Sequence, residues 1–224
     1  MTLPSILAAG HEEDAAELLS AYYRRLEDRR PSFTGSYFNS WAGGDTKDKD
    51  SITADDLVAV SFLSVDISAE AAIGILDTHR EKISRLLARI PSDRDLAGVS
   101  PSEFPEILGE GSPASQLWHV LRGRDTGRWG IGETTASKIV ARKRPGLIPI
   151  YDSVVGPLMG LKDSRGQWAA WHTAFVEDSG LSPRLATIRR LSGVTDEVSD
   201  ILVMDIVLSM YGKQTAKPLA ERNA

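Results

Sequence analysis

The sequence GIGETTASKIVARKRPGLIPIYD, which occupies residues 130–152, combines two glycines, a basic segment and an isolated carboxylate. Gly130 and Gly132 permit positive φ angles and let another backbone or a ligand approach closely. Residues 133–143 then predict a helix that ends before Pro145. The unpaired amides and the dipole at the start of such a helix suit a phosphate group. The stretch therefore predicts either a phosphate-binding hairpin between two helices or an ordinary turn that reverses the chain.

The composition of the 224 residues is typical of a soluble globular protein, with 42% hydrophobic and 25% charged residues. No apolar run is long enough to span a bilayer, and residues 1–14 have no basic region before their short apolar stretch. We therefore expect no membrane partner, no secretory signal and a cytoplasmic location. The lack of cysteine excludes disulfides, thiolate zinc sites, iron–sulfur clusters and a cysteine nucleophile. The four histidines show no metal-ligand spacing, so we expect no cofactor.

Charge is distributed unevenly along the chain. The formal net charge is −5, yet the segment from Trp118 to Pro145 carries seven bases and two acids, which gives it +5 and leaves −10 for the remainder. The bases are Arg122, Arg124, Arg128, Lys138, Arg142, Lys143 and Arg144. This asymmetry predicts an electropositive face that contacts nucleic-acid phosphates, with binding that weakens steeply as salt is added. A solvated helix surface would produce the same pattern.

Helical periodicity runs through nearly the whole chain and predicts an all-α fold. Thr53 and Ser68 are suitable N-caps, and Pro31 and Pro91 mark helix ends. Residues 31–52 are rich in Gly, Ser, Asp and aromatic side chains without periodicity, which predicts a long loop. We expect helices at residues 11–30, 53–65, 68–91, 113–122, 133–143, 153–159, 167–177, 183–191 and 196–211.

We expect residues 1–217 to form a single helical unit, with C-terminal helices over 153–211 and a frayed tail at 218–224. Asp66 and Asp205 lie in apolar surroundings in the sequence. This placement predicts buried carboxylates that need partners.

The block 130–155 resembles the helix-hairpin-helix DNA glycosylase superfamily, in particular its endonuclease III-like members. It has the glycine-hydrophobic-glycine hairpin, then Thr135-Ala136, a proline-containing connector, and Asp152 at 22 positions beyond Gly130. The resemblance implies an all-α fold in which residues 113–145 form the helix-hairpin-helix element and two helical lobes pack around a cleft. We also expect the whole chain to belong to an uncharacterised bacterial family that shares this block.

The resemblance also implies roles for individual residues. The hairpin amides of Gly130, Ile131 and Gly132 would hold a DNA phosphate, often with a monovalent cation bound at the Gly130 and Gly132 backbone. Asp152 would support cleavage of the N-glycosidic bond, because a carboxylate stabilises positive charge on the sugar or activates water. Further phosphate contacts are expected from Arg128, Thr135, Lys138, Arg142 and Lys143. Base flipping needs stacking contacts, and the aromatic candidates for these contacts are Trp129, Tyr151, Phe38 and Trp41.

Two departures from the family pattern narrow the expected activity. Thr134 stands where bifunctional members carry the Schiff-base lysine, so we expect no lyase activity. Residues 153–157 also differ from the pattern, which leaves Asp152 as either a catalytic residue or a helix N-cap. We therefore expect a DNA-binding protein that hydrolyses the N-glycosidic bond of a modified base. The alternatives are a non-enzymatic nucleic-acid-binding module and, less consistent with the local charge, a protein-interaction domain.

Overall fold

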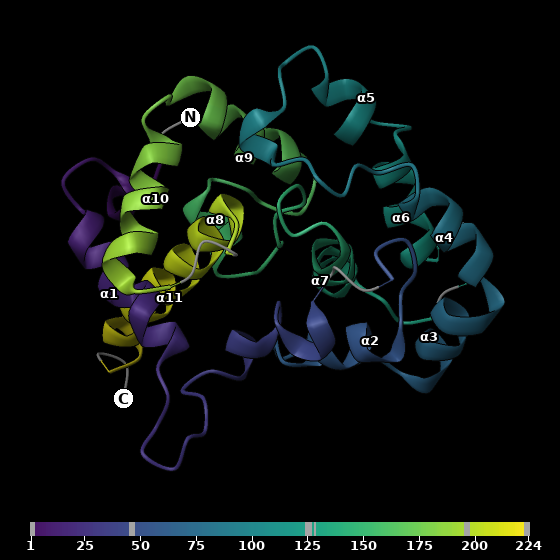
Figure 1. Cartoon of the computed structure of the whole chain (residues 1–224), viewed down its shortest axis with the longest axis horizontal. Coiled ribbons are helices and arrows are strands. Elements are labelled where there is room, and N and C mark those ends of the chain that lie inside the picture. The colour runs from purple at the N-terminus through teal and green to yellow at the C-terminus, as the bar shows by residue number, and fades with distance from the viewer. Residues whose placement is uncertain (1–2, 45–47, 124–126, 128, 195–197, 222–224) are drawn as a thin grey trace. The chain divides into compact units, whose positions relative to one another are not determined.

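Helices make up most of what the computed structural model describes, namely residues 3–44, 48–123, 127, 129–194 and 198–221 (Figure 1). These ranges contain no β-strand, and Arg25 and Pro31 form an isolated antiparallel bridge. The predicted all-α class is therefore confirmed. The glycosylase-like arrangement of two lobes around a cleft stays a prediction.

Two compact units divide the chain. Unit 1 comprises Met1–Phe33 and Tyr151–Ala224, and unit 2 comprises Thr34–Ile150. The hairpin residues 130–132 belong to unit 2, whereas Asp152 belongs to unit 1.

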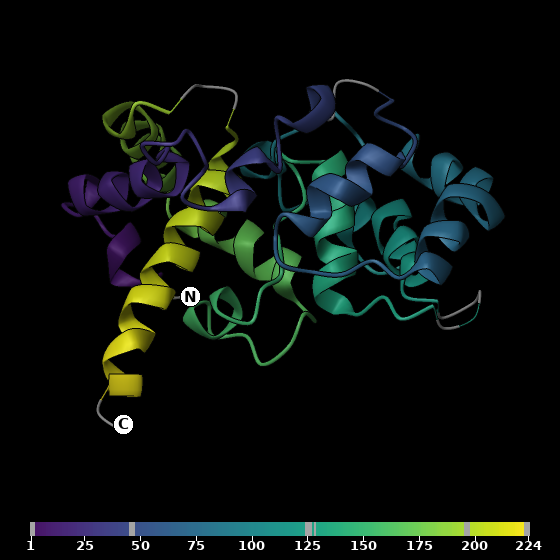
Figure 2. The same ribbon diagram turned by 90° about the horizontal axis from the view of Figure 1, so that it is seen from below.

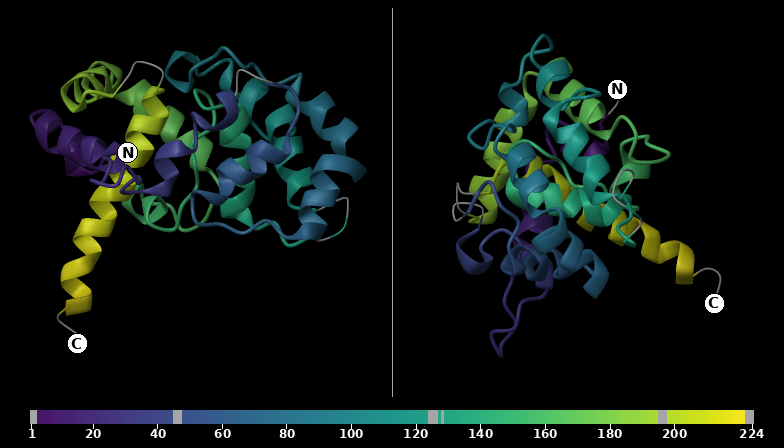
Figure 3. Two further views of the ribbon diagram at one scale, coloured as in Figure 1. Left: turned by 60° about the horizontal axis from the view of Figure 1, so that its bottom comes forward. Right: turned by 90° about the vertical axis from the view of Figure 1, so that its right-hand side faces the viewer.

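Unit 1 is built around the long helix α11 (Asp200–Glu221). Helix α1 (Glu12–Tyr23) packs against α11 and α10 (Leu181–Ser192), and α8 (Val155–Leu158) also packs against α11 (Figures 2 and 3). Helix α9 (Gln167–Glu177) contacts α10. Apolar side chains from these helices form the core, among them Leu19, Trp171, Leu185, Met204 and Val207.

A buried carboxylate lies within unit 1. Asp205 on α11 is 7% exposed, as its apolar surroundings predicted, whereas Asp66 is exposed and its predicted burial is wrong.

Burial raises the pKa of the Tyr22 phenol well above its usual range, and the neighbouring Tyr23 and Asp205 add to this effect. Tyr22 therefore stays protonated at neutral pH.

Helix α7 (Glu133–Lys143) has a central position in unit 2. It contacts α2 (Ala54–Ser61) and α6 (Pro113–Leu121), and Figure 1 shows it end-on between them. Helix α6 in turn contacts α4 (Arg80–Leu87) and α5 (Phe104–Leu108). The residues of α7 after its first turn, 136–143, are all buried. The C-terminal part of this helix therefore has no solvated face.

Capping explains several helix boundaries. The hydroxyl of Thr53 accepts a hydrogen bond from the Asp56 amide, and the Asp56 carboxylate accepts one from the Thr53 amide, which forms a capping box at the start of α2. The hydroxyl of Ser68 accepts from the Ala71 amide and caps α3 (Ala69–Ile73). Both predicted N-caps are confirmed, and α7 and α9 have the predicted bounds.

Several predicted helices are shorter than expected; the helix expected at 53–65, for example, ends at Ser61. The helix expected at 11–30 ends at Tyr23, because the exposed residues 24–30 turn back on themselves instead of packing. The helix expected at 68–91 divides into α3, a π-helical turn at Gly74–Thr78 and α4.

The structure agrees with the predicted loop at 31–52 but not with the predicted frayed tail at 218–224. The described residues of the predicted loop 31–52 contain only short 3₁₀ turns at Thr34–Tyr37 and Trp41–Gly43, so the loop is confirmed there. Helix α11, by contrast, continues to Glu221 and so includes most of the segment 218–224 that was expected to fray.

Gly74, the first residue of the π-helical turn, packs closely against a buried ring. A Cβ at this position would lie 2.1 Å from Cε3 of Trp129, whose ring is buried. Only a residue without a side chain fits here, because a rigid indole cannot move aside as the end of a flexible side chain would.

We predict that Gly74→Ala lowers the free energy of unfolding by about 1–3 kcal/mol through overpacking against Trp129. In an open helix the same change would stabilise by about 1 kcal/mol. Urea unfolding followed by circular dichroism measures the difference. Gly98→Ala is the matched control, since nothing lies within 4 Å of its Cβ position. An increase in stability for Gly74→Ala would contradict the prediction.

Candidate nucleic-acid interface

The predicted hairpin lies immediately before α7. Gly130 is exposed and has a φ of 83°, in the region that favours glycine, and Gly132 is exposed and forms the N-cap of the helix. Ile131 between them is 7% exposed. The buried Ile131 fixes the turn to the unit, while the two glycines present their backbone to solvent.

Trp129 anchors the base of this hairpin. Its indole N–H donates to the carbonyl of Leu121 at the end of α6, and its ring meets His79 edge-on with 4.9 Å between ring centroids. Its own carbonyl accepts from the hydroxyl of Ser68 at 3.3 Å. Trp129 is 6% exposed, so its expected contact with a base is wrong: the ring is used to hold the hairpin in place.

The first turn of α7 has features that favour an anion and one acidic side chain that opposes it. Gly132 has no side chain that could accept hydrogen bonds from the following amides, and the positive end of the helix dipole lies here. Thr135 is partly exposed in this turn, and its phosphate contact stays a prediction. Glu133 would repel a phosphate, but Arg122 pairs with it at 3.0 Å.

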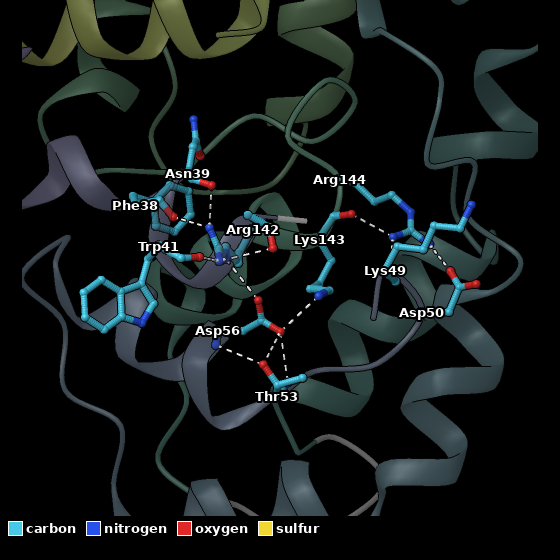
Figure 4. A network of polar contacts seen from close by, with 11 residues as sticks. Phe38, Asn39, Trp41, Lys49, Asp50, Thr53, Asp56, Arg142, Lys143 and Arg144 are labelled. Atoms are coloured by element: carbon cyan, nitrogen blue, oxygen red, sulfur yellow. Dashed lines mark hydrogen bonds and ion pairs between the residues drawn. The ribbon is translucent and has the colours of Figure 1, made fainter. Parts of the chain in front are cut away.

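Arg142 lies at the opposite end of α7 and is 2% exposed (Figure 4). Its guanidinium donates to four carbonyls of the loop before α2, those of Phe38, Asn39, Trp41 and Gly44. The Asn39 and Trp41 bonds measure 2.9 and 2.7 Å. The guanidinium carbon also lies 6.0 Å from the centroid of the Phe38 ring. A single side chain thus satisfies the inward-facing backbone of the loop.

Asp56 shares its carboxylate between two buried cations. Its Oδ1 accepts from Nε of Arg142 and its Oδ2 from Nζ of Lys143, each at 3.0 Å. Oδ2 also accepts from the amide and the hydroxyl of Thr53. None of the three charged side chains is more than 4% exposed. Such burial is tolerated because each charge is paired, and loop carbonyls accept further hydrogen bonds from Arg142.

Arg144 makes a second set of internal contacts. It donates to the carbonyls of Leu87 and Ile90 at the end of α4, to the carbonyl of Lys49 at 2.8 Å and to the carboxylate of Asp50 at 2.9 Å. The last carbonyls of a helix have no partner within it. Arg144 therefore joins the end of α4 to the loop.

These contacts overturn the prediction that Lys138, Arg142 and Lys143 bind phosphates. Lys138 is 4% exposed and donates from Nζ to the carbonyl of Leu63 at 2.7 Å. A phosphate could reach these three side chains only by displacing internal hydrogen bonds and ion pairs. Among the described bases of residues 118–145, Arg122 alone is partly exposed. The predicted electropositive face is therefore mostly interior charge.

The remaining aromatic candidates for base contacts differ in how far their side chains are exposed to solvent. Phe38 is 3% exposed beside Arg142, so its predicted base contact is wrong. Trp41 is 37% exposed, and Tyr151 is partly exposed with its ring against Gly156. For Trp41 and Tyr151 the base contact stays a prediction.

Asp152 lies at the start of α8. Its Oδ1 accepts from the amide of Val154 at 2.8 Å, and its carbonyl accepts from the amide of Gly156 at 2.9 Å. This Asx turn comes just before α8, whose N-cap position is Val154 with no side-chain cap, so the capping alternative stays a prediction. The carboxylate is also partly exposed, and its catalytic role stays a prediction.

Two elements of the predicted phosphate site stay predictions, namely the contact from Arg128 and the bound cation. Arg128 lies outside the described residues, and the monovalent cation expected at the backbone of Gly130 and Gly132 is still to be tested. In the described ranges no cluster of three or more His, Asp or Glu side chains could hold a metal ion. No helix in the same ranges has both the length and the apolar character to cross a bilayer.

Comparison with known proteins identifies one family. DUF6308, described as a family of unknown function, matches residues 15–212 of the chain. No curated protein and no solved structure matches. The resemblance of residues 130–155 to helix-hairpin-helix glycosylases therefore remains a prediction.

We predict that Asp56→Asn lowers the free energy of unfolding by about 3–5 kcal/mol, because Arg142 and Lys143 would be left as buried cations without a counter-charge. Urea unfolding at neutral pH measures this loss. Asp28→Asn is the control, since the Asp28–Arg30 pair has side chains 49% and 76% exposed, and its removal should change stability by less than about 1 kcal/mol. Equal effects of the two substitutions would show that the buried network is not needed.

Proposed function

We propose that this chain, which belongs to the DUF6308 family, binds the phosphate backbone of nucleic acid through the Gly130–Gly132 hairpin, with DNA as the expected partner. The observation that carries the proposal is the exposed glycine turn directly before an eleven-residue helix. Backbone amides at such a turn point toward solvent, and the helix dipole favours an anion there. The resemblance to the helix-hairpin-helix superfamily supports the same role.

The anchoring of the hairpin also supports this role. Ile131 and Trp129 are buried on either side of Gly130, and Trp129 bonds to the end of α6. A turn held in this way loses little conformational entropy when it binds a ligand. The proposed contact is therefore a preorganised one.

The burial of the basic side chains changes how binding to a nucleic acid is expected to depend on salt concentration. A protein that neutralises few phosphates with Lys or Arg releases few counterions. Lys138, Arg142, Lys143 and Arg144, which are buried, should therefore contribute little to the steep salt dependence that the sequence suggested.

We predict that Gly132→Asp weakens DNA binding by about tenfold or more, because its carboxylate would occupy the first-turn amides and repel a phosphate. The φ of −83° and the open space at this position accept a side chain, and aspartate is a good N-cap, so folding should be preserved. Fluorescence anisotropy with labelled duplex DNA measures affinity. Gly132→Asn provides the uncharged cap and should have a smaller effect. Unchanged affinity of the Asp variant would exclude the hairpin as the binding site.

A second candidate function is hydrolysis of the N-glycosidic bond of a modified base, with Asp152 as the catalytic carboxylate. The specific observation in its favour is the partly exposed carboxylate at 22 positions beyond Gly130. A carboxylate there would stabilise positive charge on the sugar or activate water. Thr134 replaces the amine that a Schiff base requires, so the proposal is limited to a monofunctional reaction.

We predict that Asp152→Asn abolishes base release while stability and DNA binding remain close to wild type, because Asn caps a helix about as well as Asp. Release of bases from a broad panel of damaged duplexes measures activity, and thermal unfolding checks the fold. If the wild type and the Asn variant release bases equally, Asp152 serves only as a cap. The chain would then be a non-enzymatic binding module.

A further inference from the structure

Three aromatic side chains of unit 2 form one surface cluster, which we call the aromatic platform: Tyr37, Trp41 and Phe62. Trp41 meets Phe62 edge-on, with 5.2 Å between ring centroids and 85° between ring planes. Tyr37 meets Phe62 from another direction, at 6.4 Å and 65°. Tyr37 and Phe62 are partly buried, whereas Trp41 is 37% exposed. The indole of Trp41 thus packs against Phe62 and leaves part of its surface open to solvent.

The backbone that presents Trp41 is held rigidly. Nη2 of Arg142 donates to the Trp41 carbonyl at 2.7 Å, and the following residue, Ala42, has a left-handed conformation with a φ of 52°. On the other side, the hydroxyl of Thr34 donates to the Phe62 carbonyl at 2.8 Å. Figure 4 shows the indole pointing away from the Arg142 guanidinium and the rest of the polar network. The buried cation therefore fixes the position of an outward-facing ring.

The size of the exposed surface distinguishes between possible partners. A tryptophan side chain offers about 250 Å² at most, so the exposed part of Trp41 is roughly 90 Å². A stable protein interface needs about 800 Å² from each partner. Val58, 42% exposed, is the other large hydrophobic residue exposed among the described parts of α2 and the loop before it. The exposed area suits one flat ring better than a protein surface.

Most of the charge near the platform is balanced within the protein. Among the described residues of 48–63 and 138–144, five bases exceed four acids by one, in a chain whose net charge is −5. The bases are Lys49, Lys138, Arg142, Lys143 and Arg144, and the acids are Asp48, Asp50, Asp55 and Asp56. Because Arg142 and Lys143 pair with Asp56, and Arg144 pairs with Asp50, these bases offer a phosphate no free charge, so stacking must supply most of the affinity.

We propose that the aromatic platform stacks an unpaired nucleobase, so that the chain binds single-stranded nucleic acid in preference to a fully paired duplex. This inference rests on the proposed function. The hairpin and the platform lie toward opposite ends of α7, whose eleven residues span about 16 Å. A strand held at its phosphate by Gly130–Gly132 would reach Trp41 several nucleotides further along. Every base has a ring face, so stacking makes this contact tolerant of sequence.

The test compares Trp41→Ala, Trp41→Phe and the control Val58→Ser in the full chain. Fluorescence anisotropy measures the affinity of each for a labelled single strand of about 16 nucleotides, the upper end of known site sizes, and for the matching duplex. Circular dichroism and thermal unfolding confirm that each variant is folded. Sedimentation velocity measures association between copies of the chain.

We expect Trp41→Ala to weaken single-strand binding by roughly 5- to 150-fold, as for loss of one stacked base. Trp41→Phe, which keeps a flat ring, should retain most of the affinity, and Val58→Ser and duplex binding should change less than about twofold. Unchanged single-strand affinity for Trp41→Ala, or an equal loss on the duplex, would overturn the inference while leaving the hairpin proposal standing. Wild-type protein that binds neither strand form would overturn both. Self-association that Trp41→Ala removes would assign the platform to a second copy and so overturn the inference as well.

Discussion

The Asp56 carboxylate is the contact on which unit 2 depends. It accepts from Arg142 and Lys143 at 3.0 Å each and also completes the capping box of α2. Three ionised groups that are at most 4% exposed have lost nearly all their hydration, which costs several kcal/mol per ion unless every hydrogen-bonding position is filled. Loop carbonyls fill positions on Arg142, and the amide and hydroxyl of Thr53 fill positions on Asp56. The loop, the start of α2 and the end of α7 therefore stabilise one another.

This network also changes the meaning of the basic segment. A run of cations near a glycine hairpin is the electrostatic pattern of a nucleic-acid-binding protein, but here Lys138 and residues 142–144 are interior groups. The positive charge that lies near the end of α7 interacts with the negative end of its dipole and with neighbouring carbonyls. The contacts that we propose for a nucleic acid therefore use groups that carry no formal charge, namely the hairpin amides and the ring of Trp41.

Local patterns in the sequence predicted local structure. The bounds of α7 and α9, the caps Thr53 and Ser68, and the loop after Pro31 follow from propensity and hydrogen-bonding chemistry that act over a few residues. Burial of charge could not be predicted in this way. Arg142 pairs with a carboxylate 86 residues earlier in the chain, and a pattern of neighbouring residues cannot predict a contact over such a sequence separation. One signal did exist: Asp56 stands at the third position of its helix, where a carboxylate already has backbone partners and can be buried cheaply. The predicted base contact of Trp129 failed because its partners are also distant in sequence: they lie on α6 and beside α4.

The enclosed guanidinium of Arg142 has a consequence for how the loop moves. Long loops usually open locally, at a small fraction of the free energy needed to unfold the whole protein. Four carbonyls between residues 38 and 44 bond to this one side chain, which itself belongs to the central helix. Releasing any part of the loop would expose a charge inside the unit. Opening of residues 38–44 is therefore expected to require loss of the Arg142 contacts, so that this part of the loop exchanges more slowly than an ordinary surface segment.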